Sequence, residues 1–179
     1  MTAVVPPLQT TRLDPASRPF FAADVGGTHV RVGLIRAAAA NDPSIDVLSY
    51  RKYRCADYPS LSAILSDFAS HNPQVEHCVI ATAGYALPDG TVISANLPWP
   101  LSSNRIRDEL GFADVHLVND FEAVAHAAGQ ISASQVLQLT GPTEVERGPT
   151  LVIGPGTGLG AAVWIPVGNR SVVLATEAG

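Results

Sequence analysis

The sequence predicts a mixed α/β fold, and two patterns support this. Segments with strand character at residues 20–36 and 46–54 come first, and an alternation of helical and strand-like segments follows them. The order of strand, glycine-rich turn and strand at 20–36 returns at 150–165, which predicts a second unit built like the first. Hydrophobic residues make up 46% of the 179 residues and charged residues 15%, which is enough apolar material for a core.

The first strands follow from apolar runs and turn residues. Residues 20–25 are apolar and lie between Pro19 and the Gly26-Gly27 pair, which is typical of a buried strand. Residues 29–36 alternate polar and apolar side chains, so they are expected to pair with the first strand through the glycine turn. Residues 46–54 are predicted to form a third, half-exposed strand.

Two helices are indicated by capping residues. Ser60 is the expected N-cap of the first helix, whose apolar side chains recur at helical spacing before residues 71–73 interrupt it. Those apolar residues are Leu61, Ile64, Leu65 and Phe68. Ser102 or Ser103 is expected to cap the second helix, which Gly111 would end.

The remaining elements are short apolar runs between turn residues, with one alanine-rich helix at 121–128. Strands are predicted at residues 77–83, 91–94, 115–118 and 150–154, and a hairpin at 161–165 and 172–175. We therefore expect a flexible tail at 1–18, a small α/β lobe at 19–112 and the incomplete start of a larger lobe at 113–179.

Composition excludes several classes of function. The net charge of −5 and the scattered basic residues, densest at Arg51, Lys52 and Arg54, argue against nucleic-acid or membrane binding but leave a small anionic ligand open. No apolar run approaches the ~20 residues that span a bilayer, and the N-terminus lacks a secretory signal pattern. Cys55 and Cys78 are expected to be reduced thiols of a cytoplasmic protein, and the histidines lack metal-ligand spacing.

The first candidate site is Asp24 with the Gly26-Gly27 turn at the end of a buried strand. Glycines let backbone amides approach a phosphate, and a preceding carboxylate can hold Mg²⁺ directly or through water. The alternative is an ordinary hairpin turn with an aspartate beside it.

The second candidate is the glycine-dense segment 154–160, with Gly156 and Gly158 at its centre. It fits a dinucleotide-binding pattern by spacing, but residues 161–165 look like a strand rather than the helix that this pattern requires. A phosphate-binding hairpin is therefore favoured, with a purely structural turn as the remaining alternative.

The third candidate is Asn119-Asp120, where a strand ends and a helix begins. Open α/β sheets place ligand-binding groups at such strand ends, and an aspartate there can accept a proton from a substrate hydroxyl. The alternative is that Asp120 is only the N-cap of the following helix.

Taken in order, these segments resemble the bacterial glucokinase family, within the hexokinase and actin-like (ribonuclease H-like) ATPase superfamily of sugar kinases. The matching text is DVGGT at 24–28, LVNDFEAVA at 117–125 and GPGTGLG at 154–160, with NLPWPLS at 96–102, DELGF at 108–112 and the final TEAG. The resemblance runs from about residue 20 to the end and implies an N-terminal portion of such an enzyme, using ATP and Mg²⁺ to phosphorylate D-glucose at the 6-hydroxyl at the entry to glycolysis.

The resemblance also implies roles for individual residues. Asp120 would be the catalytic base, and Asn119 and Glu177 would bind sugar hydroxyls, with Gly158 close to the sugar. Asp24 would position Mg²⁺. The amides that would face the ATP phosphates are those of Gly26, Gly27, Thr28, Gly156, Thr157 and Gly158.

Two departures from the family pattern qualify these roles. His29 stands where the family usually has asparagine, and the ending at Gly179 precedes the family's adenine-binding glycines. The 179 residues are therefore expected to lack measurable kinase activity by themselves. The alternative is a non-catalytic sugar-binding or regulatory protein derived from a sugar kinase. The preferred hexose, the phosphoryl donor and the oligomeric state, including a homodimer, stay open at this point.

Overall fold

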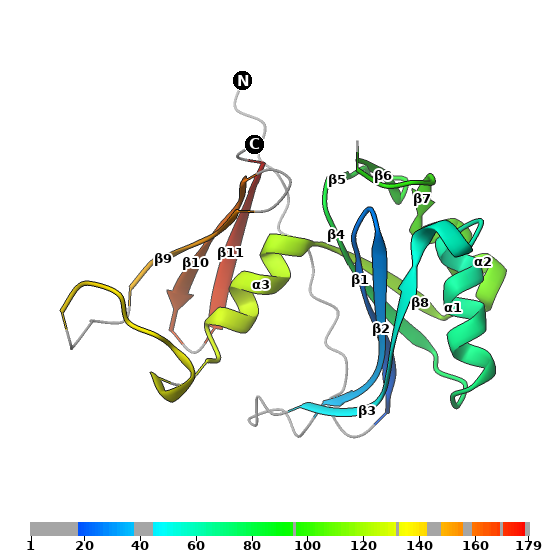
Figure 1. Cartoon of the computed structure of the whole chain (residues 1–179), viewed down its shortest axis with the longest axis horizontal. Coiled ribbons are helices and arrows are strands. Elements are labelled where there is room, and N and C mark those ends of the chain that lie inside the picture. The colour runs from blue at the N-terminus through cyan, green and yellow to red at the C-terminus, as the bar shows by residue number, and fades with distance from the viewer. Residues whose placement is uncertain are drawn as a thin grey trace.

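The computed structural model describes residues 18–37, 45–94, 96–131, 133–142, 148–155, 159–168 and 170–177 (Figure 1). The tail expected at residues 1–18 lies outside this part of the chain except for its last residue.

A five-stranded mixed sheet forms the first part of the molecule. It consists of β1 (Phe20–Val25), β2 (His29–Ala37), β3 (Ile45–Arg54), β4 (His77–Thr82) and β8 (Asp114–Asn119), in the order β3-β2-β1-β4-β8. Strands β1, β2 and β3 are antiparallel, whereas β4 and β8 run parallel to β1. The mixed sheet expected from the sequence is therefore confirmed.

Two helices cover one face of this sheet, α1 (Leu61–Ser70) and α2 (Ser103–Leu110) (Figure 1). The Ser60 hydroxyl caps α1 by accepting the Ala63 amide at 3.2 Å. Of the two serines proposed as the cap of α2, the structure uses Ser102. Gly111 ends α2 with a φ of +71°, a left-handed conformation that favours glycine.

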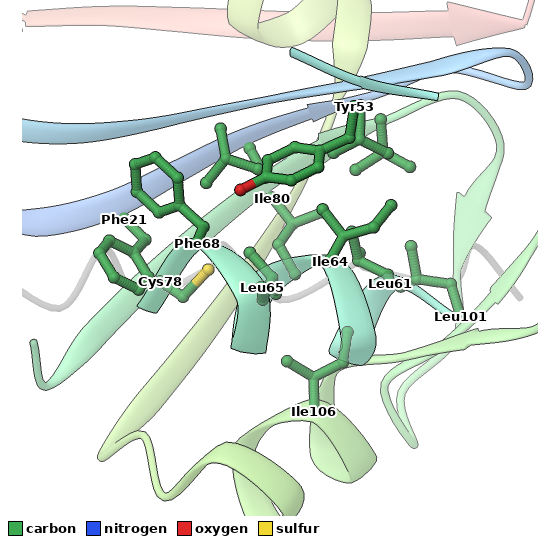
Figure 2. Packing of buried hydrophobic residues seen from close by; sticks show 14 of the residues in the cluster. Phe21, Tyr53, Leu61, Ile64, Leu65, Phe68, Cys78, Ile80, Leu101 and Ile106 are labelled. Carbon is green, nitrogen blue, oxygen red and sulfur yellow. The ribbon is translucent and has the colours of Figure 1, made fainter. Parts of the chain in front are cut away.

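The core between sheet and helices is aromatic and aliphatic (Figure 2). The rings of Phe21 and Phe68 meet edge to face at a centroid distance of 5.1 Å, which joins β1 to α1. Both cysteines are free, as expected; they are also buried, and burial raises the pKa of the Cys78 thiol to about 12. A thiol with so high a pKa stays protonated and does not act as a nucleophile at neutral pH.

A second, antiparallel sheet contains β9 (Thr150–Pro155), β10 (Leu159–Val167) and β11 (Arg170–Glu177) in the order β11-β10-β9. One of its faces packs against α3 (Asp120–Ala128) around a small core of Ala125, Ala162 and Trp164 (Figure 1). The strand that the sequence predicted after the glycine-dense segment is confirmed, and β9–β10 repeats the antiparallel pairing of β1–β2.

The other face of this second sheet is apolar and exposed. The large side chains on it are Leu151, Ile153, Val172 and Leu174, with exposed fractions between 48% and 58%. Strand β11 pairs along its whole length with β10, so the exposed apolar side chains belong to the face of the sheet and do not result from a missing strand partner of β11.

The elements that sequence reasoning missed are very short. Strands β5 (Tyr85–Ala86) and β7 (Leu101–Ser102) join the predicted β6 (Thr91–Ile93) in a small sheet, and single 3-10 turns lie at Cys55–Asp57 and Ala133–Gln135. Two or three residues are too few to show a periodicity, so such elements leave no signal in the sequence.

Strand β8 pairs with β4, so the residues up to Asn119 belong to the first sheet. The lobe boundary predicted after residue 112 stays a prediction, and sheet membership would place it after Asn119. Within the described part of the chain, no helix has the length and apolar character to cross a bilayer.

Candidate functional site

Three parallel strands end side by side, and this brings the first and third candidate segments together. Val25 at the end of β1 pairs in register with Thr82 of β4, and Thr82 pairs with Asn119 of β8. The turn after β1 and the start of α3 after β8 therefore lie at the same edge of the sheet. This is the edge at which open α/β sheets bind ligands.

The turn between β1 and β2 is held by backbone hydrogen bonds. The Gly26 amide donates to the His29 carbonyl at 3.0 Å, and the Cys55 amide donates to the Thr28 carbonyl at 2.9 Å. A side chain on Gly27 would collide with the Asn96 carbonyl oxygen, so the chain there has room only for glycine. Gly26 donates within the turn, whereas the amides of Gly27 and Thr28 donate to no backbone carbonyl of the described residues. Such amides at a turn can bind an anion.

Asp24 lies on the face of the first sheet opposite the helices and forms an ion pair. Its Oδ2 accepts from Nη1 of Arg31 at 2.7 Å, across the β1–β2 pair. The two side chains are 52% and 49% exposed, so the pair contributes at most about 1 kcal/mol to stability. The half-exposed carboxylate is open to a ligand on this face.

The residues around Asp24 fit a magnesium ion that arrives with a phosphate ligand. Among the described residues no group of three or more acidic, histidine or cysteine side chains could enclose a metal. Mg²⁺ is commonly held by one or two carboxylates together with water and substrate phosphates. A single carboxylate beside the amides of Gly27 and Thr28 suits that mode of binding.

Asn119, not Asp120, caps helix α3. The side-chain oxygen of Asn119 accepts the amides of Phe121 at 2.9 Å and Glu122 at 3.2 Å. Asp120 is the first helical residue, and its Oδ1 accepts the Phe121 amide at 2.8 Å. The alternative in which Asp120 is the N-cap is therefore wrong, although the partly exposed Asp120 carboxylate shares the Phe121 amide with Asn119.

Phe121 joins the start of α3 to the second sheet. Gly154 of β9 and Gly160 of β10 pair in register, and a side chain on either glycine would run into the Phe121 ring. The ends of β9 and β10 that flank the glycine-dense turn therefore lie against the residue that follows Asp120. Gly156, Thr157 and Gly158 themselves lie outside the described residues.

Glu177 is brought to the same place by its strand. It pairs in register with Gly160, at the end of β11 next to the glycine-dense turn. Its backbone is described but its side chain is not, so its proposed contact with a sugar stays a prediction.

Basic side chains surround His29 beside the first turn. Partial burial, and then the positive charges of Lys52, Arg31 and Arg54, lower the pKa of His29 below its ordinary value. Because the folded state holds this proton less tightly than the unfolded chain, His29 makes the fold less stable as pH falls through the ordinary titration range of histidine.

Replacing Lys52 by glutamine is expected to raise the pKa of His29 towards its ordinary value, because one of the repelling charges is removed. The pKa can be followed by NMR from the ring carbon-bound protons of His29. Arg36→Gln is the matched control, since Arg36 lies at the other end of β2 and pairs with Asp46. An unchanged pKa in the Lys52→Gln variant would contradict this account of the electrostatics.

Sequence reasoning missed three features of the site. The sequence contains Arg31 and Phe121 but does not show that they contact Asp24 and the two glycines, because both contacts depend on strand register and packing. The capping role of Asn119 carried a local signal, since asparagine is as good an N-cap as aspartate.

Comparisons with known proteins agree with these observations. A model of the family described as Glucokinase matches residues 21–179. A glucokinase-like protein of Xylella fastidiosa (strain 9a5c) is 56% identical over 169 residues, which are 94% of this chain and 51% of that protein. The chain thus spans about half the length of the curated relatives it matches.

Solved structures show the same fold. The crystal structure of a glucokinase from an Antarctic psychrotroph superposes with a TM-score of 0.74 at 31% identity and covers 90% of this chain and 50% of that one. The structure of a Balamuthia mandrillaris glucokinase in complex with glucose has a TM-score of 0.64 at 24% identity, over 90% of this chain and 48% of that one.

Proposed function

We propose, from the premise that the chain belongs to the glucokinase family, that it provides the sugar-binding and catalytic-base residues for ATP-dependent phosphorylation of D-glucose at the 6-hydroxyl. The products of this reaction are glucose 6-phosphate and ADP. The turnover is proposed for a protein of the length of its relatives, working in the cytoplasm at the entry to glycolysis.

One observation supports the proposal: the start of α3 adjoins strand ends from both sheets. Strands β1 and β8 end at the same edge of the first sheet with β4 between them, so the turn after β1 and the start of α3 share that edge. The Phe121 ring lies against Gly154 and Gly160, at the ends of β9 and β10 that flank the glycine-dense segment. Transfer of a phosphoryl group to a hydroxyl requires a carboxylate held close to the bound phosphates. The proposal gives Asp120 this position, between the two glycine-rich segments.

In the proposed reaction, Asp120 accepts the proton of the sugar 6-hydroxyl as its oxygen attacks the terminal phosphorus of ATP. The bond from that phosphorus to the bridging oxygen breaks, and ADP leaves. Asn119 and Glu177 hold other sugar hydroxyls, so that the 6-hydroxyl points at the phosphate. The side-chain oxygen of Asn119 already accepts two amides of α3, so its bond to a sugar would be donated by its NH₂ group.

The phosphates of ATP would be bound by backbone amides and a carboxylate-held ion. Gly27 and Thr28, with Gly156, Thr157 and Gly158 on the second turn, would donate their amides to phosphate oxygens. Asp24 would hold Mg²⁺ through water, and the ion supplies charge neutralisation when it is bound.

The proposal is tested by calorimetric titration of the 179-residue protein with D-glucose, with L-glucose as the control for unspecific sugar effects. We expect D-glucose alone to bind. Asp120→Asn should weaken that binding roughly tenfold, because a hydrogen bond to a charged acceptor is replaced by one to a neutral amide. Equal binding of D-glucose and L-glucose would show that the binding is unspecific. Equal affinity of the Asp120→Asn variant and the wild-type protein for D-glucose would count against Asp120 as a sugar ligand.

A coupled assay for glucose 6-phosphate tests whether the 179 residues are sufficient for turnover, and titration of ATP with and without glucose separates the two classes of function. We expect no turnover from the 179 residues alone, because an apolar sheet face is exposed and the chain spans about half the length of its relatives. Turnover by these residues would contradict that expectation. The alternative of a non-catalytic sugar-binding protein predicts glucose binding and no effect of glucose on ATP binding.

A further inference from the structure

A row of four basic side chains runs across β2 and β3 beside the first glycine turn. His29 pairs in register with Arg54, and Arg31 pairs with Lys52. Paired residues on antiparallel strands share a face of the sheet, and so do residues two apart on one strand. These four residues, which we call the basic row, therefore lie on the face that also carries Asp24, and the row begins directly after Thr28.

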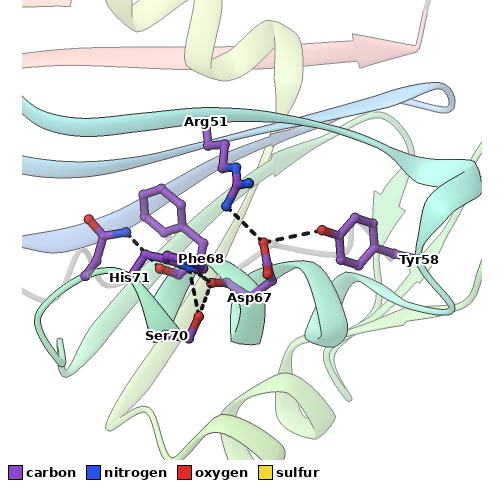
Figure 3. Close-up of polar contacts among 7 residues, drawn as sticks. Arg51, Tyr58, Asp67, Phe68, Ser70 and His71 are labelled. Carbon is purple, nitrogen blue, oxygen red and sulfur yellow. Dashed lines mark hydrogen bonds and ion pairs between the residues drawn. The ribbon is translucent and has the colours of Figure 1, made fainter.

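The neighbouring basic residues of the same strands have acidic partners. Arg51 points to the other face, where it contacts Asp67 at 3.3 Å together with the Tyr58 hydroxyl (Figure 3). Arg36, near the far end of β2, pairs with Asp46 at 3.0 Å. In the basic row, Asp24 neutralises Arg31, whereas Lys52 and Arg54 have no ion-pair partner among the described residues.

This arrangement is unfavourable for the sheet by itself. Like charges directly opposite each other on neighbouring strands destabilise the pairing, and the row places Lys52 opposite Arg31. The three cations of the row outnumber the single carboxylate of Asp24, although the whole chain is acidic with a net charge of −5. A bound anion would relieve the repulsion.

We propose that the basic row binds the oligophosphate chain of the phosphoryl donor, as a continuation of the phosphate site at the Gly27 and Thr28 amides. The inference rests on the proposed function and deepens it. Residues two apart on a strand are roughly 7 Å apart. The positive charges of the basic row are therefore spaced along β2 and β3, where a chain of phosphates can lie beside them. Two sources share this chemistry, the tail of a nucleoside triphosphate and an inorganic polyphosphate.

The test is calorimetric titration of the 179-residue protein with inorganic tripolyphosphate and, separately, with MgATP, both at constant ionic strength. The double variant Lys52→Gln/Arg54→Gln removes two charges of the row. Arg170→Gln is the matched control, because Arg170 is exposed and lies on β11 of the other sheet, at the end away from the glycine-dense turn. All variants are compared by circular dichroism to establish that they fold alike.

We expect the double variant to bind tripolyphosphate roughly five- to tenfold more weakly than the control variant, with less difference at high salt. If the double variant binds both ligands more weakly, the basic row binds the nucleotide tail. If it binds tripolyphosphate alone more weakly, the basic row binds an inorganic phosphate chain. Equal affinity of the double variant and the control for both ligands overturns the inference.

A second measurement does not depend on a variant. Saturation of the wild-type protein with tripolyphosphate should raise the pKa of His29, followed by NMR, because the added negative charge offsets that of its basic neighbours. An unchanged pKa at saturation overturns the row as the binding place. Failure of D-glucose to bind counts against the proposed function alone, so different observations would overturn the proposed function and the assignment of the basic row.

Discussion

Truncation of Phe68 to alanine is expected to lower the free energy of unfolding by about 3–5 kcal/mol. Phe68 is 1% exposed, and its ring packs edge to face on Phe21, which in turn meets Phe112 at a centroid distance of 6.0 Å. The loss combines the transfer free energy of the ring with the cavity left between α1 and β1. Domains are stable by only about 5–15 kcal/mol, so this one change removes a large share.

The two tryptophans allow this loss to be located. Trp99 packs against the first core and donates to the Tyr58 carbonyl at 3.1 Å, whereas Trp164 belongs to the small core under α3. Urea unfolding followed by fluorescence in a Trp164→Phe background therefore reports on the first core, and a Trp99→Phe background reports on the second. Phe68→Ala should shift the Trp99 transition more than the Trp164 transition.

The control for this prediction is Leu139→Ala. Leu139 is 86% exposed, so its truncation should change stability by no more than about 0.5 kcal/mol. Equal unfolding midpoints for Phe68→Ala and Leu139→Ala would show that Phe68 is not a core residue.

Substitution of Gly160 by alanine is expected to destabilise the second core by about 3 kcal/mol and to weaken glucose binding. The added Cβ would lie within the Phe121 ring, so either the ring or strand β10 must move. Phe121 directly follows Asp120, so displacement of its ring disturbs the start of α3. Fluorescence of Trp164 during urea unfolding and calorimetric titration with D-glucose measure the two effects.

A second substitution separates the collision from other causes. Phe121→Leu in the Gly160→Ala background should restore part of the stability, so the two changes together should cost less than the sum of their separate effects. Gly168→Ala, in the turn between β10 and β11, is the control for a glycine replacement without a collision. An added Cβ there meets nothing within 4 Å, and with a φ of +60° the change causes backbone strain only. Additive effects of Gly160→Ala and Phe121→Leu would argue against the proposed contact.

Most of the fold could be predicted because its signals are local. The run at Phe20–Val25 bounded by proline and glycine, the serine cap of α1 and the left-handed glycine after α2 each depend on a few neighbouring residues. The same holds for β10, where the absence of helical periodicity after the glycine-dense segment correctly favoured a strand. The strands β5 and β7 were missed because two residues carry no pattern.

The candidate site could be predicted only in part. Glycines and carboxylates at strand ends marked Asp24, Asn119 and Asp120 as candidates, and the strand register places the ends of β1 and β8 at one edge. The choice between Asn119 and Asp120 as the cap of α3 was beyond the sequence, because both side chains can accept the same amides. Geometry decides which of them does so.

By itself, the sequence determined the order and type of the main elements and the residues with chemical potential at their ends, because hydrophobic periodicity, caps and turns act over a few residues. Only the tertiary structure decided which of these residues meet. Arg31 reaches Asp24, Lys52 stands opposite Arg31, and Phe121 fills the space over Gly154 and Gly160 because of strand register and packing between distant segments. A shift of register by one residue would turn each of these side chains to the other face, so they depend on the whole sheet.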